Sequence, residues 1–299
     1  MAKRIKNILF AAALLSSSSF TLQAQSQHAN EFTVSLGAGN SGLQYQLQGG
    51  KSKSGFGWGA GMGFFHYFSR KFGVSIGLET GMFSSSVDIN DAANHYEQPI
   101  ETPSGLSGDF FLKTNYTGLN EKQTATMLQI PIMLQFQFPV SRKSFLFLGT
   151  GIKAGFPVSS KWEQHTDNLT ITGYSYYTEQ EYANMPDHGF TTYTDLNASG
   201  KLELKSPVFF ALEGGLKFSV GQGKYLYTGI YWDTGINDIN KIPVNTPPLE
   251  YNIASPANYN YKSILTEKIN PIVFGIKIKM GFGMGGVKEP KPEPAWGWE

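Results

Sequence analysis

Residues 124–138 contain a clean alternation of apolar and polar side chains. From Leu128 onward, one face holds Leu128, Ile130, Ile132, Leu134, Phe136 and Phe138, and the other holds Gln129, Pro131, Met133, Gln135 and Gln137. A period of two indicates a β-strand whose two faces meet different surroundings. A soluble β-sandwich would bury the apolar face, whereas a membrane β-barrel would turn it toward lipid.

Seven other segments alternate in the same way, and the lengths of their connections separate these two folds. The segments are 31–39, 57–68, 71–86, 144–156, 207–220, 225–236 and 271–284. The connections 69–70, 139–143 and 221–224 are short, and they alternate with the long connections 40–56, 87–123, 157–206 and 237–270. Outer-membrane barrels have short periplasmic turns and long extracellular loops. We therefore predict an all-β fold, an eight-stranded antiparallel transmembrane β-barrel in an up-and-down meander with long extracellular loops.

The N-terminal segment has the pattern of an export signal. Lys3, Arg4 and Lys6 precede a short apolar stretch, Ile8 to Leu15, and a small-residue cleavage site follows at Ala24. The apolar stretch is shorter than the roughly 20 residues that a membrane helix needs. We expect a signal peptide at 1–24, a barrel at 25–286, a Pro-rich periplasmic tail at 287–299, and a location in the cell outer membrane.

Charged residues on the polar faces of the predicted strands point into the barrel. They are Glu79, Lys153, Glu213, Lys217, Asp233, Lys277 and Lys279. An eight-stranded barrel is narrow enough for side chains to fill it, and buried charges require partners. We expect a barrel-interior charge network in which Glu79 and Glu213 pair with Lys153, Lys217 and Lys277. The alternative is that these charges line an ion path.

Pro131 interrupts the polar face of the strand at 124–138. Proline removes a hydrogen bond from the ladder between strands and is normally found at an edge or a bulge. We therefore expect a β-bulge with a local change of register at Pro131.

Composition narrows the chemistry. The net charge is +1, which gives no reason to expect a nucleic-acid partner. The chain has no cysteine, which excludes disulfides and thiolate metal sites. The histidines lack metal-ligand spacing. A lipid-modifying enzyme would need a His–Ser–acid group, for which His95 or His165 with loop serines is the only suggestion. We expect no enzyme activity, no catalytic or metal site and no cofactor.

The long connections are rich in tyrosine, as in the stretch that holds Tyr174, Tyr176, Tyr177, Tyr182 and Tyr193. Tyrosine combines a large contact area with a polar tip, which suits contact with a protein or glycan partner. The sequence thus predicts a structural or partner-binding role for the loops. The alternatives are a narrow pore and, less favoured, a lipid-modifying enzyme.

Several strands resemble a known family. Leu128 to Phe138, Phe145 to Gly151, Ala211 to Lys217 and Tyr225 to Asn240 are similar to strands of the small outer-membrane β-barrel family of Bacteroidetes, which includes the PorT-like proteins. The tail also resembles the linker that follows the barrel in OmpA-like proteins. The resemblance implies an eight-stranded outer-membrane barrel in contact with outer-membrane lipids, with an accessory role in secretion as one option. The terminal strand, Gly275 to Phe282, looks like the signal read by the barrel-assembly machinery, which would act as a partner during insertion.

Overall fold

A computed structural model describes residues 30–47, 50–101, 107–243, 246–250, 252, 259–264 and 268–284. For 46–47, 50–51, 91–101 and 107–110 the description is limited to the backbone. The predicted signal peptide and the predicted Pro-rich tail lie outside the described residues.

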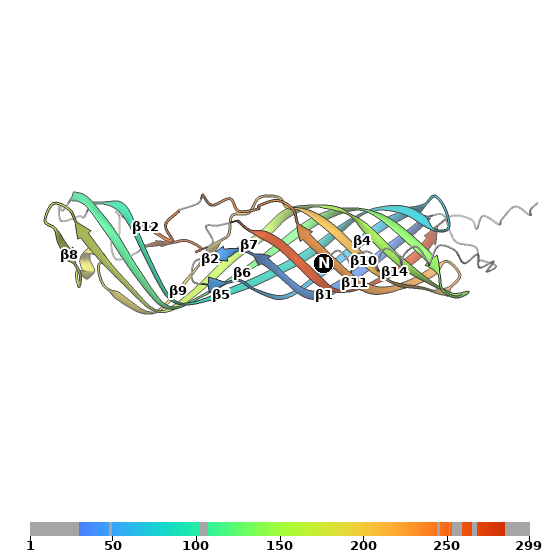
Figure 1. The fold of residues 1–299 in the computed structure, drawn as a ribbon, viewed down its shortest axis with the longest axis horizontal. Coiled ribbons are helices and arrows are strands. Elements are labelled where there is room, and N and C mark those ends of the chain that lie inside the picture. The colour runs from blue at the N-terminus through green and yellow to red at the C-terminus, as the bar shows by residue number, and fades with distance from the viewer. Residues whose placement is uncertain are drawn as a thin grey trace, which may run out of the picture.

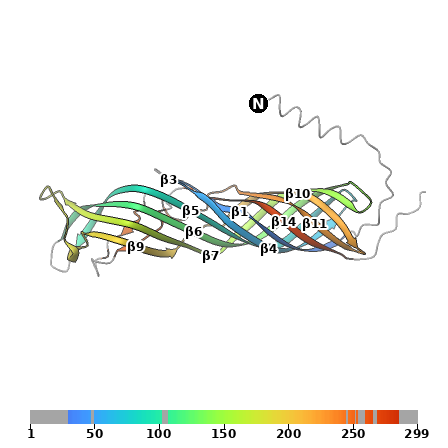
Figure 2. The same cartoon turned by 90° about the horizontal axis from the view of Figure 1, so that it is seen from below.

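Eight strands form a closed antiparallel ring (Figures 1 and 2). In chain order they are β1 (Asn30–Gln44), β4 (Lys53–Tyr67), β5 (Phe72–Glu101), β6 (Ser107–Pro139), β7 (Ser144–Ser175), β10 (Val208–Gly221), β11 (Lys224–Gly235) and β14 (Asn270–Met284). Each strand pairs with the next one in this order, and β14 returns to pair with β1. The predicted eight-stranded up-and-down barrel is confirmed.

The outer surface of the ring is apolar and its interior is polar, the reverse of a soluble domain. The exposed side chains include Leu36, Met62, Ile76, Ile132, Leu148, Ile152, Ile230, Phe274 and Ile276. We call the outward-facing apolar band, which ends toward the long connections at Leu128, Phe156 and Val158, the apolar belt. A closed ring with such a belt and a polar interior is the architecture of an integral outer-membrane barrel, because closure pairs every strand edge and lipid covers the belt. No helix among the described residues is long and apolar enough to cross a membrane.

The prediction that 87–123 and 157–206 are loops is wrong in one respect. Most of the described residues in these two ranges continue the barrel strands. β5 runs on to Glu101, β6 begins at Ser107 and β7 reaches Ser175, with β8 (Gln180–Tyr182), the 3₁₀ turn η1 (Pro186–His188) and β9 (Thr192–Lys201) following. Polar residues such as Gln123 and Gln164 share the buried face here, so the apolar alternation is weaker than in the belt. β9 is a single strand that pairs antiparallel with β7.

We call this part, formed by Val87–Glu101, Ser107–Gln123, Ser160–Ser175, β8 and β9, the extracellular extension (Figure 1). Its buried side chains form a core of their own that continues into the mouth of the barrel: Leu43, Tyr45, Phe83, Val87, Ile89, Leu112, Tyr116, Leu119, Met127, Trp162, Leu169, Ile171, Phe190 and Phe209 belong to it. Ile239, Leu249, Tyr259, Ile264 and Ile269, from the connection between β11 and β14, pack onto the same core. The small pairs β2 (Gln46–Leu47) with β3 (Gly50–Lys51), and β12 (Leu249–Glu250) with β13 (Asn260–Tyr261), complete the strands. The core of the extension is thus continuous with side chains at the outer mouth of the barrel.

The β-bulge predicted at Pro131 is wrong. The pairs Ile76–Ile132 and Glu79–Gln129 have the same register on either side of it, and the irregularity in β6 lies between Thr126 and Met127. Gly77 lies opposite Pro131 in the neighbouring strand. A Cβ at Gly77 would lie 3.3 Å from the Pro131 ring, so glycine leaves room for the ring without the extra residue of a bulge. The same Cβ would lie 2.6 Å from the backbone oxygen of Met62, so glycine is the residue that fits at position 77.

Candidate functional site

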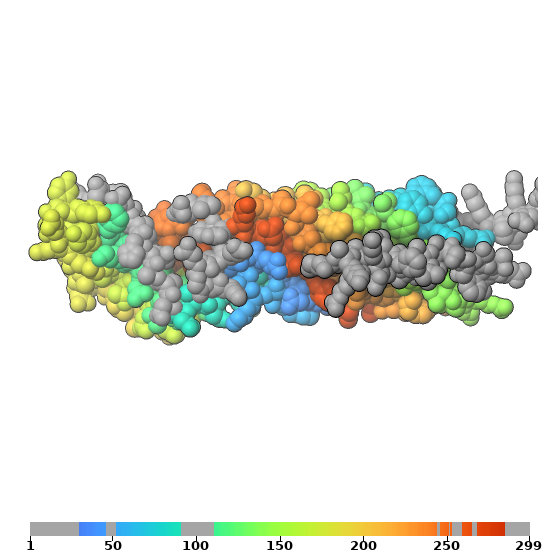
Figure 3. All heavy atoms as spheres, viewed as in Figure 1, coloured from blue at the N-terminus to red at the C-terminus, as the bar shows by residue number. Residues whose placement is uncertain are grey.

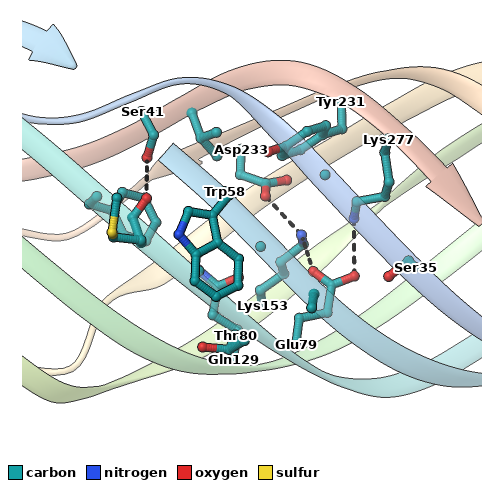
Figure 4. Close-up of a pocket in the computed structure, with 17 residues that line it drawn as sticks. Ser35, Ser41, Trp58, Glu79, Thr80, Gln129, Lys153, Tyr231, Asp233 and Lys277 are labelled. Atoms are coloured by element: carbon teal, nitrogen blue, oxygen red, sulfur yellow. Dashed lines mark hydrogen bonds and ion pairs between the residues drawn. The ribbon is translucent and has the colours of Figure 1, made fainter. Parts of the chain in front are cut away.

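The charges inside the barrel form a connected network below the mouth (Figure 4). The Lys153 ammonium donates hydrogen bonds to Glu79 Oε2 at 2.7 Å and to Asp233 Oδ2 at 2.8 Å. Lys277 donates to the other oxygen of Glu79 at 3.0 Å. Lys153 and Asp233 are each 2% exposed. Lys153 of β7 therefore pairs with Asp233 of β11, and it shares Glu79 of β5 with Lys277 of β14.

Glu213 extends this network toward the end of the barrel that carries the short turns. Lys279 donates a hydrogen bond to Glu213 Oε1, and the ammonium of Lys277 lies 3.8 Å from Glu213 Oε2. Lys277 thus bridges the carboxylates of Glu79 and Glu213. The ammonium of Lys279 also lies 5.5 Å from the ring centre of Phe65 and 5.7 Å from that of Phe147. Cation–π attraction to these rings adds to the ion pair in stabilising the buried ammonium.

Lys217 belongs to a second cluster and does not pair with the carboxylates that the sequence suggested for it. Its partner is Glu31, and both side chains are fully buried. The ammonium also faces the ring of Tyr225 at 4.1 Å, and the Tyr227 hydroxyl donates to Glu31 Oε2 at 2.5 Å. The sequence-based prediction of interior charges did not include Glu31. The alternation of β1, which places Glu31 on the inward face with Thr33 and Ser35, was the signal that could have identified it.

All seven residues of the predicted interior network lie inside the ring, and Glu31 makes an eighth. Four carboxylates therefore face four ammonium groups in the described interior, so the contents of the barrel are electrically neutral. The sequence alone left open which acid pairs with which lysine, because each pair joins strands that are remote in the chain.

Little space remains in the barrel between its two ends. Two cavities of about 30 Å³ adjoin the network, each with room for a water molecule or two. Above the network Phe83 and Phe209 stack at 5.7 Å between ring centroids, and near the short turns Tyr67 and Tyr227 join their hydroxyls at 3.1 Å. These two aromatic pairs therefore lie on either side of the charge network.

Side chains at the far end of the extension form a small surface cluster, which we call the distal patch: Phe111, Lys113, Tyr174, Tyr176 and Glu181. Lys113 pairs with Glu181 at 3.1 Å and lies 5.3 Å from the centre of the Tyr174 ring. Tyr176 meets both Phe111 and Tyr174 edge to face, with centroids 4.8 and 5.5 Å apart. The Thr172 hydroxyl donates to Glu181 at 2.7 Å. These contacts hold aromatic rings and a charged pair in a fixed arrangement at the surface.

Glu121 is a fully buried carboxylate in the core of the extension. It accepts hydrogen bonds from Gln123 Nε2 at 2.9 Å, from the Ser263 hydroxyl and from the backbone N–H of Ile264 at 2.9 Å. Burial raises the pKa of Glu121 above its usual value, although these three donors oppose the shift. The residue ties the connection between β11 and β14 to the extension.

We expect this connection to be held more firmly in acid than at neutral pH. Because the folded pKa of Glu121 is raised, its contribution to stability is fully present below the unfolded value of 4.5 and is lost as the pH rises through the folded value. Hydrogen exchange at Ile264, corrected for the intrinsic rate, should therefore slow as the pH falls toward 4.5. Glu121→Gln should remove this dependence. Equal pH profiles in the two proteins would contradict the assignment.

Among the described residues, the structure does not assemble the His–Ser–acid group that was considered for His95 or His165. His165 lies on the exposed face of β7, with its ring nitrogens 3.5 Å from Asp167 and 3.7 Å from Asp195, and it bonds Asn197 at 3.1 Å. The side chain of His95 lies outside the described residues. Among the described residues no group of three or more acidic, histidine or cysteine side chains could hold a metal ion.

Comparison with known proteins gives similarities in structure alone. No family model matches the chain, and no curated protein matches it. The outer membrane protein OprG from Pseudomonas aeruginosa is similar over 88% of this chain and 100% of its own, with 15% identity and a TM-score of 0.36. Neisserial surface protein A covers 85% of this chain and 97% of its own, with 8% identity and a TM-score of 0.35. The N-terminal barrel domain of Pseudomonas aeruginosa OprF covers 86% and 100%, with 7% identity and a TM-score of 0.30. At such values no ligand or activity of these proteins carries over to this chain.

Proposed function

We propose that this outer-membrane barrel is a closed anchor that presents the extracellular extension to a binding partner, and that it is not an enzyme. The extension is the observation that carries the proposal. Three barrel strands continue into it, and a core of buried side chains gives it a fixed shape. A mere linker between strands would not need such a core, whereas a recognition surface gains from being rigid before it binds.

The distal patch is the proposed contact site. It lies at the end of the extension that carries β8, farthest from the barrel (Figures 1 and 3). Tyr176 is 57% exposed, and the charged pair beside it offers both a donor and an acceptor. Exposed tyrosines with polar neighbours are favoured in recognition surfaces because they provide area at low entropic cost.

Cross-linking on intact cells, together with a glycan array, tests this proposal. We expect the wild-type chain to capture a protein or to bind a glycan class, and Tyr174→Ser/Tyr176→Ser to lose that partner. Phe68→Ser is the matched control, because Phe68 is an exposed aromatic residue at the opposite end of the barrel. Identical partners for the wild type and the double variant would count against the distal patch.

A narrow pore is the competing function, and conductance separates the two. The neutral charge network and the aromatic side chains at both of its ends predict that the protein in planar bilayers gives no stable current steps. Large and reproducible steps would show that the interior opens, and would favour the pore.

We further propose that the chain belongs to the PorT-like group of Bacteroidetes barrels. The support is the resemblance of the strand at Leu128 to Phe138 and of the hairpin formed by β10 and β11. An accessory role in secretion and contact with the barrel-assembly machinery follow from that resemblance alone. Co-purification with secretion components from the native cell would test the first of these.

A further inference from the structure

Three exposed lysines lie together on the outer face of the sheet, just beyond the apolar belt. Lys161 on β7 is opposite Lys201 on β9, and opposite Thr124 on β6. Lys122, two residues from Thr124, is opposite Glu163. Alternate residues of a strand share a face, so Lys122, Lys161 and Lys201 project from the same side. We call these three residues the lysine cluster.

The cluster has an excess of positive charge. Glu163 is the carboxylate within it and accepts a hydrogen bond from Lys161 at 2.5 Å. That bond, with a smaller contribution from the charge of Lys122, lowers the pKa of Glu163. Glu203, the next exposed acid along the chain from Lys201, lies 3.4 Å from Lys241. One carboxylate facing three ammonium groups leaves two positive charges to attract an anion.

The position of the cluster matches the headgroup layer of the outer leaflet. On β7 the apolar belt ends at Val158, which is 69% exposed, and Lys161 follows three residues later. At about 3.3 Å per residue and a tilt of roughly 40°, Lys161 lies on the order of 7 Å above the belt. The polar layer on each side of a bilayer is about 5 to 8 Å thick. Lysine stems can also lie along apolar surface while the ammonium reaches a polar group.

We propose that the lysine cluster binds the phosphate groups of glycolipid headgroups in the outer leaflet. Charge complementarity selects an anion. Continuity with the apolar belt selects an anion that carries acyl chains, because one lipid can place its chains on the belt and its phosphates on the lysines. The inference rests on the barrel and its belt, so it stands independently of the partner-binding function.

The test compares lipid binding by full-length protein in zwitterionic detergent, using native mass spectrometry with two probes. One probe is diphosphorylated lipid A and the other is the same lipid after removal of its phosphates. Each lysine near a headgroup phosphate adds to the attraction, so Lys122→Gln/Lys161→Gln/Lys201→Gln should bind the phosphorylated probe at least about tenfold more weakly. Binding of the dephosphorylated probe should not change.

Lys71→Gln/Lys143→Gln/Lys224→Gln is the control, because it removes the same charge from exposed positions at the short turns. Heat-modifiable gel migration verifies that both triple variants fold. An equal loss of binding in the control, or equal affinity of the wild type for the two lipids, would overturn the proposal. Competition by millimolar inorganic phosphate as strong as that by the lipid would assign the cluster to a soluble anion. None of these outcomes bears on the partner-binding function, which is tested separately by the distal patch variant.

Discussion

Lys153→Met is expected to lower the free energy of unfolding by about 3–5 kcal/mol, the cost of leaving a buried charge without its partner. Lys153 is the only cation within 4.0 Å of the Asp233 carboxylate among the described residues. Glu79 would keep Lys277 as a partner, so the loss falls mainly on Asp233. Urea unfolding in lipid vesicles, followed by tryptophan fluorescence, measures the change.

The control for this prediction is Lys224→Met, a change of the same type at an exposed turn, which should cost little. The double variant Lys153→Met/Asp233→Leu should recover most of the lost stability, because replacing both charges leaves no unpaired group. If the single variant does not fold, recovery of the fold in the double variant tests the same ion pair. A double variant no more stable than the single one would contradict the role given to the ion pair.

Trp162→Ala is expected to destabilise the extracellular extension by about 3–5 kcal/mol while the barrel stays folded, because truncating a large buried aromatic side chain leaves a cavity. Trp162 is 3% exposed in the core of the extension. Its indole packs against Gly200 of β9, where a Cβ would come within 2.8 Å of the ring. The base of the sheet formed by β6, β7 and β9 therefore depends on this side chain.

Limited proteolysis separates the two parts of the molecule. In the Trp162→Ala variant, cleavage should become faster within β6 to β9 of the extension, whereas the heat-modifiable gel shift that reports the closed barrel should persist. Tyr177→Ala is the matched control, since Tyr177 is 89% exposed. Unchanged cleavage would mean that the extension does not depend on the core described for it. Loss of the gel shift would mean that extension and barrel unfold as one unit.

Most of the barrel could be predicted from the sequence because its signals are local. Alternation such as that from Leu128 to Phe138 requires only neighbouring positions, and it appears wherever a strand lies between lipid and a polar interior. The alternation of short and long connections then indicated the barrel. The same reasoning placed the seven interior charges on the inward face.

The extension could not be predicted in the same way. Beyond the belt the outer face of the strands meets water, and the inner face accepts Gln123, Gln164 and Thr166 beside apolar residues. The contrast between the two faces, on which strand prediction depends, is therefore weaker there. Residues 87–123 consequently resemble a polar loop, although 87–101 and 107–123 belong to two long paired strands.

The sequence by itself determined the fold class, the inward and outward faces of the strands, and the types of residue that fill the barrel. The tertiary structure decided which charges meet. Lys217 pairs with Glu31, far away in the chain, and not with Glu213 on its own strand, because ring closure and register bring β1 and β10 to face each other across the interior. It also decided that Pro131 needs no bulge, since only the register shows that Gly77 lies across from it. A side chain's face follows from its place along one strand, but its partner depends on how all eight strands are aligned.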